Sequence, residues 1–566
     1  MTAMFETDVD QASIDPTFFA PMSADVVDVL IEEYEKAKQR IHELHSLFQR
    51  PECMAAVSHF IQGNLPDKQY TLSGTLSSLF ELQGALGHLT ATFWDRTLRV
   101  TDVLDYMPQK RREQWFEQIQ NPLGKQHYRS HRDQAPEWLI HPLPAFEMAT
   151  VRATMADLLS QRAKFFAERV DGVFRALSRE HVTNRTSGFS RRMIIDRVIS
   201  CYGSIGHSQA GSINDLRCVI AKFMGRDEPK WNDSHGLIES ARRHNGQWMS
   251  ADGGSFRIRI YNGAGTAHIE VHPDMAWRLN AVLASIYPSA IPADLRTRPK
   301  TRAKVRDFVL RENPLPFAVL SLISQMKKGY RAAGLDRRDR VVFEDIPRTR
   351  TFGFGPHDKA VLAQAERVLE SLGGVKDKVD SCELWRFDYE PAEILDQVIC
   401  NGCIPDAKTH QFYPTPENIA LAAVGRAMEG ATDDMTWCEP SAGQGGLANY
   451  MPNARLTCVE ISSLHCSILA AKGYRVVEGD FLQWKPSQPF SRIVMNPPFS
   501  EGRWQAHLTH AAEMLDRTNG KLVAILPAIA RGKTVLEDFD LEWSGIFANE
   551  FAGTAVNVVI LTATPR

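Results

Sequence analysis

The tetrapeptide Asn496-Pro497-Pro498-Phe499 combines an amide, two prolines and an aromatic ring, and it follows the apolar run Ile493-Val494-Met495. The apolar run predicts a buried parallel strand. Because proline has no N–H for a sheet ladder and has a fixed φ, the chain must leave the sheet here, with Asn496 at the carboxyl end of the strand. Ligands of open α/β sheets bind at that edge. A stiff loop with an amide and a ring suits a flat, amine-bearing group such as adenine, although the four residues taken alone favour a simple strand end with Phe499 in the core.

A glycine-rich turn and two acidic residues end the three preceding predicted strands. Glu439-Pro440-Ser441-Ala442-Gly443-Gln444-Gly445-Gly446 follows the segment TWCEP and is predicted to open a helix, so that the backbone passes close to a ligand. Glu460 ends the second strand, 21 residues after Glu439, where a carboxylate can accept hydrogen bonds from both hydroxyls of a ribose. Asp480-Phe481 ends the third strand, where the acid can accept from an adenine amino group and the ring can cover the base. Since the first loop has no basic residue, these residues predict an adenosine site for a cofactor without a pyrophosphate.

Upstream of the glycine-rich turn, the segment Phe412-Tyr413-Pro414-Thr415-Pro416 is predicted to cap the amino-acid end of that cofactor through the Thr415 hydroxyl and the backbone. The residues predicted to bind the cofactor are therefore Tyr413, Thr415, Pro416, Glu439, Pro440, Ser441, Ala442, Gly443, Gly445, Glu460, Ile461, Asp480 and Phe481.

The elements that must position these residues begin at about residue 411. From there short apolar segments alternate with helical patterns, and seven segments predict strands: TWCEP, LTCVEI, YRVVEGDF, RIVMNPPF, KLVAILP, GIFANEF and NVVILTAT. This alternation predicts a doubly wound, mostly parallel sheet, so the fold class is α/β with a C-terminal Rossmann-like seven-stranded domain over 406–566. A mainly helical α+β region precedes it, with predicted divisions 1–150 (helical), 151–306 (basic, α+β) and 307–405 (a small mixed connecting domain).

Helical spacing of apolar residues predicts helices over 24–50, 84–106 and 146–181. The first of these suits either a coiled-coil dimer or ordinary helix packing, so a homodimer stays open. Two segments with the alternating residue pattern of β-strands, 255–261 and 266–271, flank the turn Asn262-Gly263-Ala264-Gly265. Together they predict a β-hairpin.

The C-terminal motifs resemble those of the class I S-adenosylmethionine-dependent methyltransferases, specifically the DNA amino-methyltransferases that form N6-methyladenine. The matching motifs, in order, are YPTP at 413–416, EPSAGQGG at 439–446, VEI at 459–461, GDF at 479–481 and NPPF at 496–499. Their order resembles the gamma group of that family. The resemblance covers about 411–566, while residues 150–280 resemble an uncharacterised domain placed ahead of methylases in prophage and plasmid genes.

The resemblance implies S-adenosylmethionine as the cofactor and Asn496, Pro497, Pro498 and Phe499 as the catalytic residues. It implies that the side-chain carbonyl of Asn496 and the backbone carbonyl of Pro497 accept the two N6 hydrogens of adenine. Phe499 would then stack on a base flipped out of the duplex. No metal is expected to take part.

Charge is segregated along the chain, although the formal net charge is only −3. Residues 151–350 carry 34 Lys and Arg against 20 Asp and Glu, whereas 1–150 carry 13 against 21. The basic block predicts contact with the backbone of double-stranded DNA, and a solvated basic face is the alternative. The residues predicted to contact DNA are Arg296, Arg298, Lys300, Arg302, Lys304, Arg306 and Arg503, with the 255–271 hairpin or the 296–306 arm entering a groove. In the gamma group a target-recognition region usually follows the last strand, so here target recognition is expected from the first 400 residues.

Nine cysteines in 566 residues do not predict a disulfide framework, and neither a secretion signal nor an apolar membrane span is recognisable. The expected location is the cytoplasm. Cys400 and Cys403, with His410 and Cys382, have the spacing of a partial zinc site, but buried thiols are the simpler interpretation.

Three other functions remain open at this point. Adenine N6 methylation of RNA uses the same chemistry. Methylation of a protein glutamine is a second alternative, although that group generally has tyrosine at the position of Phe499. A DNA-binding regulator with a vestigial methyltransferase fold is the third.

Overall fold

The structure of the chain is a computed structural model that describes residues 24–64, 80–101, 103–127, 137–179, 181, 183–298, 310–311, 313–335, 341–353, 355–380, 382–404, 412–533, 535–551 and 555–566. The backbone contacts divide the chain into two compact units. The first comprises Met1–Ile238, Arg242–Trp248 and Ser255–Val309, and the second Glu239–Ala241, Met249–Gly254 and Leu310–Arg566. The four predicted domains stay a prediction.

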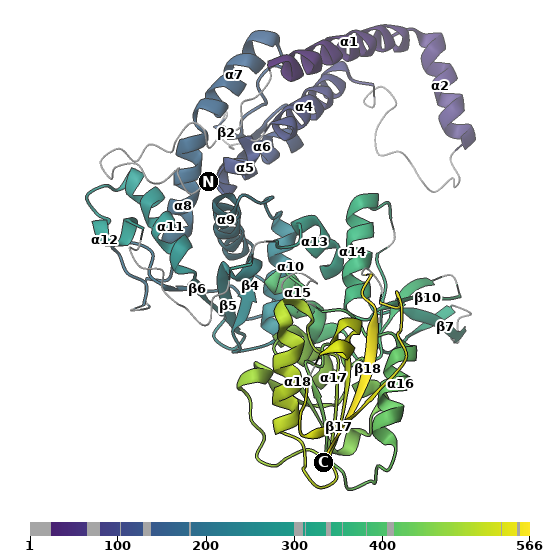
Figure 1. Cartoon of the computed structure of the whole chain (residues 1–566). Helices are drawn as coiled ribbons and strands as arrows, with labels where there is room; N and C mark the ends of the chain where they lie inside the picture. Colours follow the sequence, from purple (N-terminus) through teal and green to yellow (C-terminus); the bar gives the residue numbers. More distant parts are fainter. Residues whose placement is uncertain are drawn as a thin grey trace. The chain divides into compact units, whose positions relative to one another are not determined.

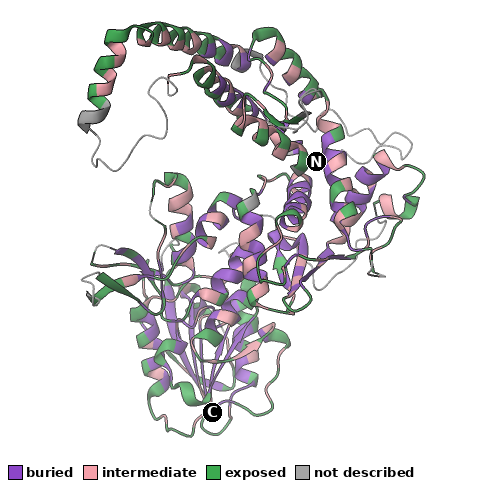
Figure 2. Cartoon of the chain, turned by 180° about the vertical axis from the view of Figure 1, so that it is seen from behind, coloured by how far each residue is buried: buried purple, intermediate pink, exposed green. Residues whose placement is uncertain are grey.

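The second unit contains a seven-stranded sheet with the order β14-β13-β12-β15-β16-β18-β17 (Figure 1). Its strands are β12 (Trp437–Pro440), β13 (Leu456–Glu460), β14 (Arg475–Glu478), β15 (Arg492–Met495), β16 (Lys521–Pro527), β17 (Phe539–Trp543) and β18 (Val558–Pro565). The strands β12 to β16 pair in parallel, and β18 is antiparallel to both β16 and β17. The predicted mostly parallel α/β sheet is therefore confirmed. All residues of β12, β13 and β15 are buried, as Figure 2 shows for this sheet, because helices cover both of its faces.

Three helices cover this sheet: α16 (Glu417–Met428), α17 (Ser463–Ala471) and α18 (Arg503–Glu513). Alternate residues of β15 point to opposite faces, so Ile493 and Met495 pack in one core cluster with α18, whereas Val494 packs in the other with α16. Both faces thus bury an apolar layer, which fixes the register of the strand that precedes Asn496.

Two sequence predictions in this region are wrong. The segment GIFANEF at 545–551 is not a strand of the sheet and forms only an isolated bridge between Phe547 and Val558. The strand at this edge is β17, which precedes that segment in the chain. β17 is an edge strand with a half-buried alternation, and Ile546 in the predicted segment is exposed. In addition, the glycine-rich turn after β12 opens no α-helix, because Pro452 interrupts the short connection, which contains the 3₁₀ turns η4 (Ala448–Tyr450) and η5 (Asn453–Arg455).

The remainder of the second unit is a small α+β region. It consists of β4 (Met249–Ala251), η3 (Asp252–Gly254), α13 (Phe317–Ser324), β7 (Tyr330–Leu335), β8 (Val341–Asp345), β9 (Thr349–Arg350), α14 (Lys359–Ser371), β10 (Val375–Val379), β11 (Cys382–Arg386) and α15 (Ala392–Asn401). The strands β10, β11 and β9 form an antiparallel sheet, and β7 and β8 form a separate hairpin. A hydrogen bond from Gln397 Nε2 to Ser467 Oγ, 2.9 Å long, links α15 to α17.

The first unit is mainly helical. Its helices are α1 (Ala24–Phe48), α2 (Pro51–Asn64), α4 (Leu82–Val100), α5 (Val103–Tyr106), α6 (Gln109–Gln120), α7 (Met148–Ser160), α8 (Arg162–Ala176), α9 (His207–Met224), α11 (Pro273–Ile286) and α12 (Ala293–Arg296), while α10 (Trp231–Arg243) is shared between the units. Its strands are β1 (Lys125–His127), β2 (Glu137–Ile140), β3 (Arg192–Ile195), β5 (Phe256–Tyr261) and β6 (Thr266–Val271). The predicted hairpin is confirmed as β5 and β6, and the helix predicted over 146–181 is divided into α7 and α8 at Gln161.

Buried ion pairs join α8 to α9 in this unit. Arg169 is fully buried, and its Nε donates a 2.6 Å hydrogen bond to Asp215 Oδ1. A 3.2 Å bond from its Nη1 reaches Glu228. Breaking such a buried pair leaves an uncompensated charge, so we infer that these contacts specify how the two helices pack. Among the described residues of the whole chain, no helix is long and apolar enough to cross a membrane.

Candidate active site

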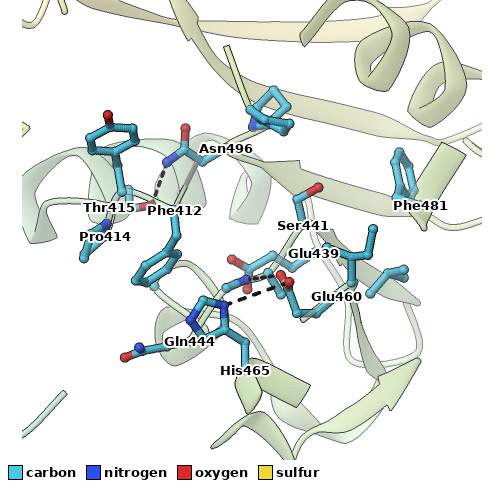
Figure 3. Close-up of a pocket in the computed structure, with 18 of the residues that line it drawn as sticks. Phe412, Pro414, Thr415, Glu439, Ser441, Gln444, Glu460, His465, Phe481 and Asn496 are labelled. Atoms are coloured by element: carbon cyan, nitrogen blue, oxygen red, sulfur yellow. Dashed lines mark hydrogen bonds and ion pairs between the residues drawn. The ribbon is translucent and has the colours of Figure 1, made fainter. Parts of the chain in front are cut away.

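A cavity of about 1270 Å³ lies at the carboxyl ends of β12, β13 and β15 (Figure 3). The chain winds outward from β12 through β13 to β14 and then returns to β15 on the other side of β12, so the cavity is at the switch point where open α/β sheets bind ligands. The predicted site residues that line it are Tyr413, Thr415, Glu439, Ser441, Ala442, Gly443, Glu460, Ile461, Asp480, Phe481, Asn496, Pro497, Pro498, Phe499 and Arg503. Pro416, Pro440 and Gly445 do not line it.

Glu439 holds the glycine-rich turn in shape. Its Oε2 accepts a 2.7 Å hydrogen bond from Ala448 N, and its Oε1 accepts a longer one, 3.3 Å, from Leu447 N. Burial raises the pKa of Glu439 to about 8, although these two N–H groups act in the opposite direction. The carboxylate predicted to bind the cofactor is thus already hydrogen-bonded to the loop.

Gly443 and Gly445 both have left-handed φ values in this turn, and the contact at Gly443 is the tighter one. The φ of Gly443 is +55°, and a Cβ at this position would lie 2.5 Å from the ring of Phe412. Its N–H donates a 2.8 Å hydrogen bond to Glu460 Oε2. The turn therefore approaches both the Phe412 ring and the acid that ends β13.

Glu460 is buried and oriented by backbone donors. Besides the bond from Gly443, its Oε1 accepts a 2.8 Å hydrogen bond from Ser462 N. Burial raises the pKa of Glu460, while these hydrogen bonds lower it. The next residue, Ile461, is 63% exposed and lines the same cavity, so an acceptor for hydroxyl groups and an apolar surface lie side by side.

Asn496 is held by Thr415. The amide Nδ2 of Asn496 donates a 3.0 Å hydrogen bond to Thr415 Oγ1, and Figure 3 shows the amide oxygen directed away from that contact. In this arrangement the amide NH2 donates, and the hydroxyl, which can donate or accept, is the acceptor. The carbonyl oxygen of Asn496 is left to accept from another group. The Thr415 hydroxyl, predicted to cap the cofactor, accepts this bond and lines the cavity, and its own O–H can still donate.

Asp480 and Phe481 follow β14. Asp480 caps η6 (Phe481–Gln483) by accepting a 3.0 Å hydrogen bond from Leu482 N, and its other oxygen accepts from Gln483. Phe481 is 3% exposed and belongs to the core, and only part of it reaches the cavity.

His507 in α18 lines the cavity and was not recognisable from the sequence. Its ring lies 5.4 Å from that of Phe481, and its Nδ1 is 3.3 Å from Ser441 Oγ. Burial lowers the pKa of His507 to about 4, so the imidazole is neutral at neutral pH. A lone histidine in a helical pattern carries no signal that distinguishes it from an ordinary core residue.

The small α+β region also contributes to the cavity, through Gly373 and Asp388. The Gln444 side chain donates a 2.6 Å hydrogen bond to Ser371 O, and Lys472 Nζ lies 2.8 Å from Asp388 Oδ2. These contacts tie the glycine-rich turn to residues about 70 positions earlier in the chain.

Phe499 and the residues that follow it differ in their placement. Phe499 lines the cavity and also packs against both core clusters of the sheet. Arg503 lines the cavity, and its Nη2 lies 3.3 Å from Glu501. The next residue, Trp504, is 2% exposed and belongs to the core.

The remaining predicted DNA contacts lie in the first unit or outside the described residues. Arg296 ends α12, and Arg298 follows it. Lys300, Arg302, Lys304 and Arg306 lie outside the described residues.

The cysteines of the suspected zinc site, Cys382, Cys400 and Cys403, are buried, and His410 lies outside the described residues. In the part of the chain that the structure describes, no group of three or more His, Cys, Asp or Glu side chains is arranged to hold a metal ion.

Comparison with known proteins gives a partial match. Residues 129–289 match a family model described as a domain of unknown function, DUF4942. No curated protein matches the chain.

Solved structures that are similar to part of the chain include three methyltransferases. A structure described as a putative RNA methyltransferase from Pyrococcus horikoshii has 20% identity over 29% of this chain and 91% of its own, with a TM-score of 0.24. A type I restriction-modification methyltransferase subunit from Streptococcus thermophilus has 18% identity over 27% of this chain and 44% of its own, with a TM-score of 0.24. The magnesium protoporphyrin IX methyltransferase of Synechocystis PCC 6803, with bound S-adenosylmethionine, has 12% identity over 26% of this chain and 79% of its own, with a TM-score of 0.23.

Proposed function

We propose that this protein transfers a methyl group from S-adenosylmethionine to the N6 amino group of adenine in DNA. The observation that carries the proposal is the orientation of Asn496. Its amide NH2 is engaged by Thr415, so its carbonyl oxygen is presented as an acceptor in the cavity that also contains the glycine-rich turn and Glu460.

The residues of the cavity fit the proposed cofactor. Glu460 is a buried acceptor for the ribose hydroxyls, and the exposed side chain of Ile461 offers a flat apolar surface to the adenine ring. The missing Cβ of Gly443 keeps the turn open beside Phe412. When bound, S-adenosylmethionine supplies an activated methyl group on a sulfonium.

Asn496 and Pro497 would act on the amine of the target. The lone pair of an adenine amino group is delocalised into the ring, which makes it a poor nucleophile. Two carbonyl oxygens that accept the two N–H groups favour a tetrahedral nitrogen, whose lone pair can form a bond to the methyl carbon in line. The bond from that carbon to sulfur would break at the same time, and the methylated nitrogen would then release one proton to solvent. The side-chain oxygen of Asn496 and the backbone oxygen of Pro497 are the two acceptors, and proline at 497 and 498 keeps the loop stiff.

Phe499 would contribute its ring to the flipped base. The side chain lines the cavity while packing against the core, so its position is already set before a base enters. Stacking on a held ring offsets part of the few kcal/mol needed to unstack a base from the duplex.

The test is direct. The full-length protein is incubated with S-adenosylmethionine carrying a deuterated methyl group and, in separate reactions, with unmethylated genomic DNA, with RNA or with a protein extract. The nucleosides or peptides are then analysed by mass spectrometry. We expect deuterated N6-methyldeoxyadenosine. The same label found only in RNA, or only in glutamine of a protein substrate, would assign one of the alternative functions instead.

Asn496→Ala is the matched variant. We expect it to abolish methyl transfer while the affinity for S-adenosylmethionine, measured by calorimetry, stays within roughly threefold, because the amide acts on the amine and not on the donor. Equal losses of transfer and donor affinity would show that the role assigned to Asn496 is wrong.

A further inference from the structure

The strands β3, β6 and β5 present two different faces. One face is apolar: Met193, Ile195, Ile258, Ile260 and Ile269 are each at most 1% exposed. The other face carries the alternate residues of the same strands, and on β5 these are half-buried. All of these residues lie within the 129–289 segment and within the first unit.

The second face is arranged in rows set by the strand register. In the first row Glu270 is paired across the sheet with Arg192 on one side and Arg257 on the other. In the next row His268 is paired with Arg259. Cross-strand partners lie about 5 Å apart, so these side chains form one continuous patch.

A single carboxylate forms ion pairs with two arginines in the first row. Glu270 lies 2.6 Å from Nη2 of Arg192 and 2.6 Å from Nη2 of Arg257. Burial alone would raise the pKa of Glu270, but the hydrogen bonds from the two arginines lower it, so it is ionised at neutral pH. The row keeps a net positive charge, and the side chain of Arg192 is 44% exposed.

Arg259 has no acidic partner among the described residues. Its guanidinium lies 4.4 Å from the centroid of the Trp248 ring and 5.0 Å from that of Tyr261, and its buried Nε has no hydrogen-bond partner in the described part of the chain. The buried Nδ1 of the adjacent His268 also has no such partner. A partly buried cation without a counter-charge is costly, and a bound anion would remove that cost.

The Trp248 ring orders the arginines of both rows. The guanidinium of Arg257 lies 4.7 Å from its centroid and that of Arg192 lies 5.5 Å from it. Stacking on an aromatic ring holds a guanidinium flat, with its N–H edge available to an oxyanion. Burial is the main cause that lowers the pKa of His268; the positive charges of Arg259 and Arg192 act in the same direction, and Asp196 acts against them.

We propose that this face of β3, β6 and β5, with Arg192, Arg257 and Arg259 as its cations, binds the phosphodiester backbone of DNA. The choice of DNA over other polyanions rests on the proposed function. The cations are spread over two rows and two strands, which suits successive phosphates of a strand better than a single free phosphate. This assigns DNA contact to the face of the sheet that contains the 255–271 hairpin, whereas the sequence predicted entry of the hairpin or the arm into a groove.

The experiment measures DNA binding apart from methylation. Full-length protein is titrated against a fluorescent 30-base-pair duplex, and the dissociation constant is followed by anisotropy over a range of NaCl concentrations. For Arg259→Gln we expect at least about tenfold weaker binding at low salt, because the charge-assisted hydrogen bonds to one phosphate are lost. We also expect the slope of log K against log salt to fall by about 0.9, the value for one lost phosphate contact.

Arg175→Gln is the matched control. Arg175 is an exposed arginine of α8 in the same unit, and it pairs with Asp171. Its variant loses the same charge, yet its salt slope should equal that of the wild type. Arg192→Gln is the second test variant, because the partly exposed Arg192 side chain is removed with little risk to folding. Circular dichroism confirms that each variant is folded.

Each outcome decides the proposal. Reduced slopes for Arg259→Gln and Arg192→Gln, with an unchanged slope for Arg175→Gln, support it. Wild-type slopes for both test variants overturn it, even if the protein methylates adenine in DNA. If RNA or inorganic phosphate competes more strongly than unlabelled DNA at constant ionic strength, DNA is not the ligand. If the wild type transfers no methyl group to DNA, the proposed function fails, while the slopes still show whether the face binds a polyanion.

Discussion

Replacing Thr415 by valine tests whether its hydroxyl is needed to orient Asn496 or to bind the cofactor. Valine has nearly the shape of threonine but cannot accept the 3.0 Å hydrogen bond from Asn496 Nδ2. Without that acceptor the Asn496 amide is free to rotate and to present its NH2, a donor, to the amine of the target. We therefore expect a loss of transfer rate with little change in donor binding.

The magnitude follows from the single bond that is lost. A hydrogen bond between neutral groups contributes about 0.5–1.5 kcal/mol, which corresponds to a roughly two- to tenfold lower rate of methyl transfer. Thr415→Ser keeps the hydroxyl and should retain most of the rate. The rate is measured in single-turnover assays at saturating DNA and donor, and the donor affinity by calorimetry.

The opposite pattern would refute this reasoning. If Thr415→Val leaves the single-turnover rate unchanged and weakens donor binding, the hydroxyl holds the amino-acid end of the cofactor, as the sequence alone predicted. If both variants behave as the wild type, the contact to Asn496 has no role in transfer.

Two further predictions concern the cavity wall. Gly443→Ala places a Cβ 2.5 Å from the Phe412 ring in a residue with φ +55°, so the turn must shift to relieve this contact and a strain of about 1–2 kcal/mol. Because the shifted turn no longer fits the donor, we expect roughly tenfold weaker donor binding by calorimetry. Gly425→Ala, in α16 with open space around its Cα, is the control and should bind normally. For His507, burial lowers the pKa from 6.5 to about 4, so the unfolded chain binds a proton that the native chain does not, and stability should fall by about 2 kcal/mol between pH 7.5 and pH 5. Without His507, the stability of His507→Gln should depend less on pH, by about 2 kcal/mol over this range. Stability is measured by urea unfolding followed by tryptophan fluorescence. If the pH dependence is unchanged, His507 binds a proton as readily in the native state as in the unfolded chain.

Several features of the protein were accessible from the sequence because they are local. Apolar runs and strand-ending residues predicted the core strands β12 to β16, and the carboxyl ends of parallel strands meet at one edge of the sheet. For that reason residues as distant as Glu460 and Asn496 were expected near each other, and both line one cavity. The hairpin of β5 and β6 was equally predictable, because alternation and a glycine-containing turn are both short-range signals.

Other features depend on contacts between residues far apart in the chain. Thr415 and Asn496 are 81 residues apart, and no local pattern shows that they share a hydrogen bond. The contribution of Asp388 to the cavity is of the same kind. The segment GIFANEF was as apolar as a strand, yet β17 took the edge position, since pairing with β18 and burial of one face decide an edge strand.

The candidate site of this protein was thus predictable from residue types at strand ends, because strand direction brings them together in any parallel sheet. The partners of each side chain were decided by tertiary structure. The clearest case is the face with Arg192, Arg257 and Arg259: the sequence showed only a basic block, and cross-strand register placed three arginines around Glu270 and Trp248.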